Sequence, residues 1–154
     1  MKKTVKTREI LAVYNIIGQA KYTKMEDADK VRAWKIARAL KPKATKFDED
    51  VKDAQEKLKP EGDFDERLKK AIEFERLKNA KEDASKVMSE AEYADFIKEY
   101  KAYEKTVNEA VEEFGDKDVE VEFEPLSEEA FGRLMASNEW TMQQASLVGD
   151  FVCE

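Results

Sequence analysis

Four acidic side chains near residue 120 alternate in a way that resembles the start of a calcium-binding loop. They are Asp116, Asp118, Glu120 and Glu122. Such a loop needs glycine at its sixth position for a sharp turn and a bidentate glutamate at its twelfth. Val121 and Ser127 occupy those two positions, so the match fails at both. The solvent-facing side of a strand explains these acids better, and we predict no metal site.

Covalent and acid–base chemistry would have to proceed without histidine, the commonest general base, because the chain contains none. Cys153 is the only cysteine, and no glycine-rich phosphate loop or second cysteine motif accompanies it. A catalytic pair among the 35 Asp and Glu residues stays open as an alternative, but no feature of the sequence selects one. We therefore predict that the protein is not an enzyme and uses no cofactor.

The most concentrated basic charge lies in one segment of the chain. Six cations follow one another there without an intervening acid: Arg32, Lys35, Arg38, Lys41, Lys43 and Lys46. Acidic residues come directly afterwards, so a helix through this region is basic in its first half and acidic in its second. One interpretation is a solvated face paired with acidic neighbours. The other is a binding face, for which we take Arg32, Lys35 and Arg38 as the candidate cations.

Two long helices must position these side chains. Between residues 29 and 59 apolar side chains recur at spacings of three and four, and between 93 and 114 mostly aromatic ones do the same. The first seam is Ala33, Ala37, Leu40, Ala44, Phe47, Val51, Ala54 and Leu58; the second is Tyr93, Phe96, Tyr100, Tyr103, Val107, Ala110 and Phe114. Because large side chains pack against small ones without voids, we expect the rings to face the alanines in a long antiparallel helical hairpin, with arms of about 24–59 and 90–114.

Proline and glycine residues, which bend or end helices, delimit the remaining helices. Pro42 falls inside the first arm, whose seam keeps its register there, so we expect a kinked but continuous helix. Pro60 and Gly62 end the arm. The next helix, about 64–79, is expected to pack weakly or at the far end of the hairpin, because polar residues outnumber its apolar ones. Residues 79–89 are interpreted as a polar linker with one short strand.

A strand and three short helices complete the prediction. Val119, Val121 and Phe123 alternate with glutamates, which is typical of a half-buried strand. A strand needs a partner for its backbone groups, and the candidates are residues 4–6, residues 85–88 or another molecule. Capping residues predict one helix at about 8–21 after Thr7 and another after Ser127. A last amphipathic segment covers about 139–151.

Composition gives the fold class. The 154 residues are the size of a single domain, 1–154, and few turns are expected with 5 Gly and 3 Pro. We predict a mainly α (α+β) protein with shorter helices packed on the hairpin and a small two-stranded sheet. A net charge of -7 argues against direct nucleic-acid binding. The apolar run at residues 10–20 is interrupted by polar residues and is not interpreted as a signal peptide, and no stretch is long enough to cross a membrane.

The order of elements resembles a family of small uncharacterised proteins from tailed phages and prophages, known as a domain of unknown function. The resembling segments are Glu9-Ile10-Leu11-Ala12-Val13-Tyr14, Trp34-Lys35-Ile36-Ala37-Arg38-Ala39-Leu40, Gln55-Glu56-Lys57-Leu58, Val119-Glu120-Val121-Glu122-Phe123 and Pro125-Leu126-Ser127. The resemblance brings no catalytic residues. It implies a phage context, in which such a chain is an accessory or virion-assembly protein.

Two functional hypotheses follow. The first is a non-enzymatic, phage-type accessory or assembly protein that acts by protein–protein interaction through its helices or by strand addition. Its partners would be a phage or host protein or a second copy of the chain, in the host cytoplasm or on the virion. The alternative is an acidic inhibitor that mimics nucleic acid and binds a host protein. It depends on Glu120, Glu122 and Glu124, spaced about 6–7 Å apart along one strand face.

Overall fold

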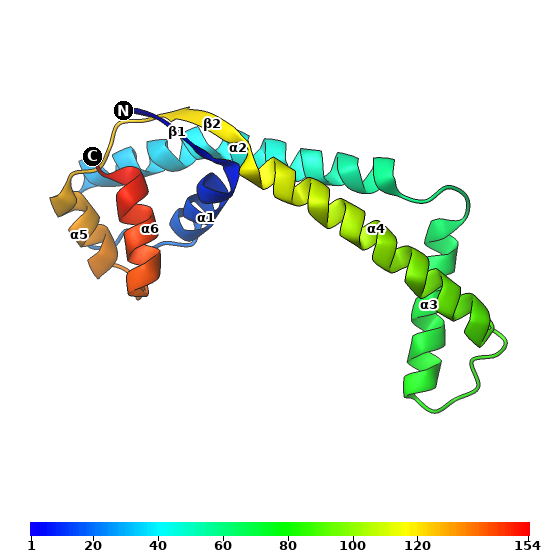
Figure 1. The fold of residues 1–154 in the computed structure, drawn as a ribbon. Coiled ribbons are helices and arrows are strands. Elements are labelled where there is room, and N and C mark those ends of the chain that lie inside the picture. Colours follow the sequence, from blue (N-terminus) through cyan, green and yellow to red (C-terminus); the bar gives the residue numbers. More distant parts are fainter. The chain divides into compact units, whose positions relative to one another are not determined.

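The computed structural model describes residues 1–154. The protein is mainly helical with one small sheet, as predicted (Figure 1). The elements are β1 (Lys2–Lys6), α1 (Thr7–Gly18), α2 (Asp27–Leu58), α3 (Phe64–Asn79), α4 (Glu90–Asp116), β2 (Asp118–Glu122), α5 (Glu128–Ala136) and α6 (Met142–Val152). The chain groups into two compact units, one of residues 1–50 and 113–154 and the other of residues 51–112.

Helix α2 is continuous for 32 residues and contains Pro42, which confirms the prediction of an unbroken helix. Proline leaves the carbonyl four residues earlier without its helical donor. Pro42 is exposed, so water can take the place of that donor. The helix begins about one turn later than predicted, because the Glu26 carbonyl accepts from the backbone N–H groups of Asp29 and Lys30, at 3.0 and 2.9 Å.

The core of the first unit joins the first half of α2 to α1, β2, α5 and α6. Its largest fully buried side chains are Ile10, Val13, Ile36, Leu40, Leu134, Val148, Phe151 and Val152. Ile36 lies one residue before Ala37 of the predicted seam, and Ala37 itself is only half-buried. The apolar face of the first half of α2 therefore packs against this core. The predicted seam is displaced around the helix, because it includes Ala37 in place of Ile36.

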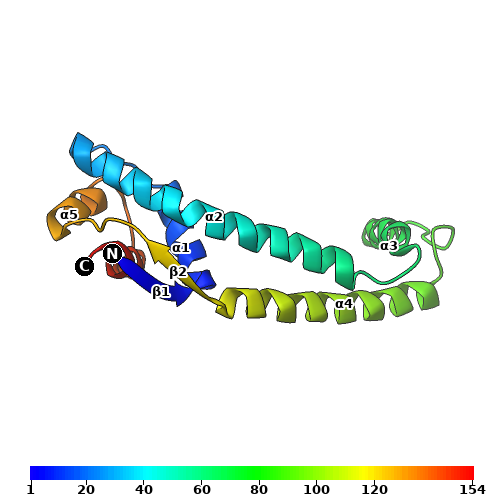
Figure 2. The ribbon, with the colours of Figure 1, turned by 90° about the horizontal axis from the view of Figure 1, so that it is seen from above.

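The sheet pairs β1 with β2 in antiparallel fashion (Figure 2). Val5 lies opposite Val119, and Lys3 lies opposite Val121, with Val121 and Phe123 buried in the core. The predicted strand is confirmed, and residues near the N-terminus are its partner. The predicted strand at residues 85–88 is wrong: those residues form a turn in the second unit.

Thr7 has a different role from the predicted helix cap. It is the first residue of α1, and Lys6 takes the cap position without a side-chain hydrogen bond. Both the backbone N–H and the hydroxyl of Thr7 donate to the carbonyl oxygen of Lys117, at 2.9 and 3.0 Å. Buried Thr7 therefore joins the start of α1 to the start of β2, which holds the sheet in register.

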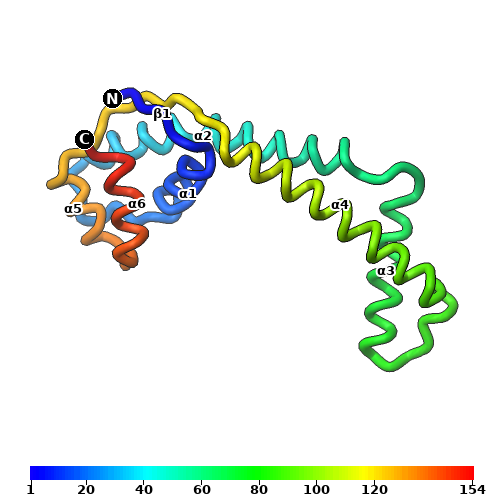
Figure 3. Tube along the Cα trace, in the orientation of Figure 1, coloured from blue at the N-terminus to red at the C-terminus, as the bar shows by residue number.

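The second unit is built around aromatic contacts between α3 and α4, and Figure 3 traces the chain through both helices. Phe64 is 2% exposed, with its ring centroid 5.5 Å from that of Phe96 and 5.3 Å from that of Tyr103. The rings of Phe74 and Tyr93 stack at 4.5 Å. One prediction is thereby wrong, because the rings of α4 pack on rings of α3 rather than on alanines of α2. Of the two alternatives for α3, weak packing is also wrong.

Arg67 connects α3 to α4 beside these rings through an ion pair. Its guanidinium donates to both carboxylate oxygens of Glu99, at 2.6 and 3.2 Å, and lies over the rings of Phe64 and Phe96. The same hydrogen bonds hold the pKa of Glu99 below its ordinary value. Phe47, a residue of the predicted seam, is only half-buried and belongs to neither core.

Candidate interaction site

The acidic face of β2 is interleaved with lysines of β1. The antiparallel register places Lys2 opposite Glu122 and Lys6 opposite Asp118. The ammonium of Lys2 lies 3.3 Å from the Glu120 carboxylate, and that of Lys6 lies 2.7 Å from Asp118. The face is consequently mixed in charge. The sequence could not show this, because only the choice of β1 as partner brings the lysines there.

Arg32 and Glu124 come from the two sets of predicted binding residues, and the structure brings them together. A guanidinium nitrogen of Arg32 lies 3.1 Å from the Glu124 carboxylate. The pair attaches α2 to the segment that follows β2. Arg32 therefore has an ion-pair partner within its own chain, whereas the other two predicted cations, Lys35 and Arg38, have none.

Lys35 and Arg38 are both exposed on α2, and 3.6 residues per turn place Arg38 about 160° around the helix from buried Ile36. The same face carries Val31, 50% exposed, and Trp34, 56% exposed. The guanidinium carbon of Arg38 lies 5.3 Å from the centroid of the Trp34 ring, in the range of a cation–π contact. We call this face the Trp34 stripe: Val31, Trp34, Lys35, Arg38 and Lys41.

The charge of the Trp34 stripe is not neutralised within the chain. Among the basic residues of this half of α2, Lys30 pairs with Asp27, Arg32 with Glu124 and Lys46 with Asp50. Lys35, Arg38 and Lys41 form no ion pair. An exposed tryptophan among unpaired cations is unusual for a free surface, because tryptophan and arginine are enriched where proteins bind one another.

Trp34 was missed by the sequence analysis, which considered only charged residues as candidates. The available signal was its position: it lies one residue beyond Ala33 and outside the apolar seam, in a segment otherwise rich in charge. A large apolar side chain off the buried face of a helix has to be explained, whereas a lysine there does not.

A second surface feature of the first unit is a groove between α5 and α6, with a volume of about 570 Å³. Its lining is partly apolar and partly acidic. We call it the α5–α6 groove, and its lining includes the apolar residues Phe131, Met135, Met142 and Ala145, Gly149, and the acidic residues Glu128, Asp150 and Glu154. Met142 is 82% exposed. Exposed methionines adapt to the shape of a partner.

Both helices of the groove begin at well-formed caps. The hydroxyl of Ser127 accepts from the backbone N–H of Ala130 at 3.1 Å, which confirms the predicted cap of α5. Thr141 and Gln144 form a reciprocal capping box at the start of α6. The helices approach closely at Gly149, where an added Cβ would lie 2.8 Å from Cε1 of Phe131. These contacts fix the width of the groove.

Cys153 lines the same groove but is poorly suited to nucleophilic chemistry. Burial raises the pKa of its thiol, and the negative charges of Glu128 and Asp150 raise that pKa further. The thiolate is the reactive form of cysteine, so this environment disfavours it. No group of three or more histidine, cysteine, aspartate or glutamate side chains is arranged to hold a metal ion.

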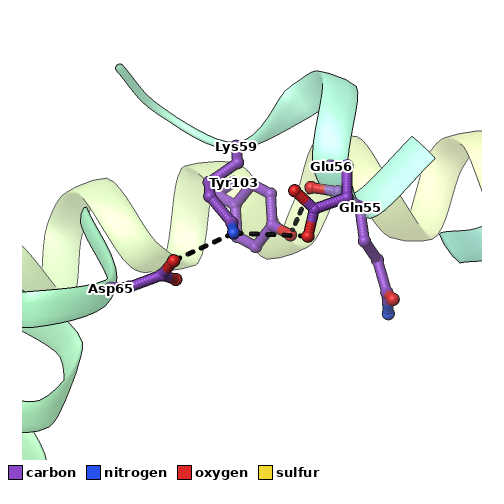
Figure 4. Close-up of polar contacts among 5 residues, drawn as sticks. All are labelled: Gln55, Glu56, Lys59, Asp65 and Tyr103. Carbon is purple, nitrogen blue, oxygen red and sulfur yellow. Dashed lines mark hydrogen bonds and ion pairs between the residues drawn. The ribbon is translucent and has the colours of Figure 1, made fainter. Parts of the chain in front are cut away.

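One further polar cluster, in the second unit, has a structural role (Figure 4). The ammonium of Lys59 lies 3.1 Å from Asp65 and 3.3 Å from Glu56, and these hydrogen bonds raise the pKa of Lys59. The phenol of Tyr103 donates to the carbonyl of Gln55 at 2.9 Å. The cluster joins the last turn of α2 to the start of α3 and to α4. The polar groups of the cluster form hydrogen bonds with one another, which is why we assign them a structural role.

No helix of the structure is both long enough and apolar enough to cross a lipid bilayer. Comparison with protein-family models, with curated proteins and with solved structures gives no match. The candidate functional surfaces are therefore identified from the geometry alone.

Proposed function

We propose that the protein is a non-enzymatic interaction module, a phage-type accessory or assembly protein, which binds another protein through the Trp34 stripe. The observation that carries this proposal is the exposed indole of Trp34 beneath Arg38, with Lys35 and Lys41 unpaired beside them. Burying an indole against a partner removes a large apolar area from water. The cations add orientation and speed of association.

The same stripe favours a protein partner over nucleic acid. Protein surfaces that bind nucleic acid neutralise many phosphates and therefore need a broad basic face. Here three unpaired cations share a helix face with a single aromatic ring, and Asp48, Glu49 and Asp50 follow on the same helix. The complementary partner surface is an apolar groove with carboxylates at its edge. Such a groove accepts an amphipathic helix face by a common recognition mode.

The distribution of charge supports assembly more than nucleic-acid mimicry. A mimic needs a continuous acidic surface, whereas Asp118, Glu120 and Glu124 each have a basic partner within 3.3 Å. Lysines alternate with carboxylates across the sheet.

The test is quantitative capture of partners from phage-carrying bacterial cells by wild-type protein, Trp34→Ala and the matched control Ile72→Ala. Ile72 is also a large exposed apolar residue, at 60%, but it lies on α3 in the second unit. Loss of an interface tryptophan usually costs at least 2 kcal/mol, about 30-fold in affinity. Trp34→Ala should lose the partner and Ile72→Ala should retain it. Equal capture by all three proteins, or capture abolished by nuclease, would contradict the proposal.

A further inference from the structure

We infer that the α5–α6 groove of one copy of this chain receives the Trp34 stripe of a second copy. This inference rests on the proposed function and names the partner of the same surface. It follows from two features of the first unit: an exposed aromatic and cationic helix face, and a groove lined by apolar and acidic residues.

The apolar parts of the two surfaces match in character and size. A volume of about 570 Å³ lies within the range of pockets that bury small organic ligands, so the groove has room for an indole ring. Its lining includes the ring of Phe131 and two methionines, Met135 and Met142. Thioether sulfur makes favourable contacts with aromatic rings, and methionine adjusts its shape to them. Both partners of the contact, Trp34 and Met142, expose more than half of their surface in the single chain.

The charged parts are complementary as well. Lys35, Arg38 and Lys41 form no ion pair, and neither do the side chains of Glu128 and Asp150, which line the groove. The charge of each surface thus lacks a partner of its own. When the cations of the stripe lie beside these carboxylates, both sets of charges are paired. The carboxylates of the groove also repel acidic helices, which excludes them as partners.

The stripe and the groove are different surfaces, so a single contact between two copies is not symmetric. A copy that offers its stripe still has an empty groove, and a copy that fills its groove still has a free stripe. Two copies that exchange these contacts about a two-fold axis form a closed dimer, and all other rotations between neighbours produce larger rings or open filaments. Self-association that increases with concentration is therefore expected.

The test begins with sedimentation velocity and with fluorescence of a Trp140→Phe variant, in which Trp34 is the only tryptophan. Trp140 packs against Phe131, so phenylalanine is the conservative replacement. As concentration rises, the emission of Trp34 should shift to shorter wavelength while the sedimentation coefficient increases. A chain that stays monomeric with unshifted emission up to about 1 mM, the weakest affinity that would matter, overturns the inference.

Charge reversal provides the matched control. Arg38→Glu and Asp150→Lys should each weaken self-association at least about tenfold, an effect within the range of close charge pairs at interfaces. An equimolar mixture of the two variants should associate again. In the mixture, the carboxylate introduced at position 38 of one copy meets the ammonium introduced at position 150 of the other, and the unaltered stripe and groove can also pair. Lys101→Glu, a charge change on α4 in the second unit, should have no effect. Failure of the mixture to recover contradicts the inference.

The outcomes separate this inference from the proposed function. If the purified chain remains monomeric while Trp34→Ala still loses a different protein in capture experiments, the stripe is a binding surface and its partner is not a second copy. If the chain is monomeric and the stripe binds nucleic acid instead, both statements fail.

Discussion

The guanidinium of Arg38 lies over the indole of Trp34, one turn earlier on the same exposed face of α2. A cation–π contact at an exposed site is worth about 0.5–1 kcal/mol. That is enough to favour one arrangement of two long side chains before any partner arrives. Pre-ordering of this kind reduces the conformational entropy lost on binding.

Trp34→Ala should therefore leave folding almost unchanged. The side chain is 56% exposed and belongs to neither core, so the free energy of unfolding should fall by no more than about 1 kcal/mol, the cation–π term included. Urea denaturation measures this directly. A loss of about 3 kcal/mol or more would mean that Trp34 is a packing residue.

Phe64→Ala should be strongly destabilising, by about 3–5 kcal/mol, because it empties a buried site surrounded by three rings. Phe47→Ala should cost clearly less, since Phe47 is half-buried and outside both cores. Sequence reasoning gives the opposite order. Urea denaturation of the two variants decides between them, and a larger loss for Phe47→Ala would restore the packing that the alanine seam predicts.

Gly149→Ala should destabilise the first unit by about 1–3 kcal/mol, the usual effect of overpacking. Its new methyl group would lie 2.8 Å from Cε1 of Phe131, which would have to move. Gly132→Ala is the matched control, because Gly132 lies in α5 and, beyond its chain neighbours and the adjacent backbone of its own helix, no atom lies within 4 Å of the added carbon. There alanine should stabilise by about 0.5–1 kcal/mol through its helix preference. Thermal unfolding with equal effects at the two sites would contradict the close approach of α5 and α6.

Glu99→Gln tests the ion pair with Arg67. The pKa of Glu99 is lowered in the folded chain, so its contribution to stability is present above the unfolded value of about 4.3 and is lost as pH falls through the lower folded value. The stability difference between wild type and Glu99→Gln should thus be largest near neutral pH and shrink in acid.

Urea denaturation across a pH series measures this difference. Glu104→Gln is the control, since Glu104 is exposed and forms no ion pair. A wild-type advantage over Glu99→Gln that stays constant down to about pH 3 would mean that packing rather than charge is responsible.

Local signals in the sequence predicted the elements well. Alternation at residues 118–123, the cap at Ser127 and the stop at Pro60 and Gly62 depend on neighbouring residues only. The bounds of α3 and the strand of β2 agree with them. The continuity of α2 through Pro42 followed from the apolar register, which a loop would have disrupted.

Partners between elements could not be predicted in the same way. A heptad seam identifies the buried face of a helix but not the neighbour that covers it. The rings of α4 gain more contact from Phe64 and Phe74 than from alanines, but the many polar residues of α3 hide these two rings in the sequence. The strand glutamates looked continuous and acidic because the lysines between them come from the other end of the chain.

The central claim is that the Trp34 stripe contacts another protein molecule, and site-specific photo-cross-linking in cells tests it most directly. A photoreactive residue at Lys35 is compared with one at Lys101, an exposed lysine of the second unit. Irradiation should give a discrete protein adduct from position 35 and none from position 101. An adduct of twice the chain mass identifies a second copy, and any other mass identifies a different protein. No adduct from position 35, or equal adducts from both positions, would contradict the account.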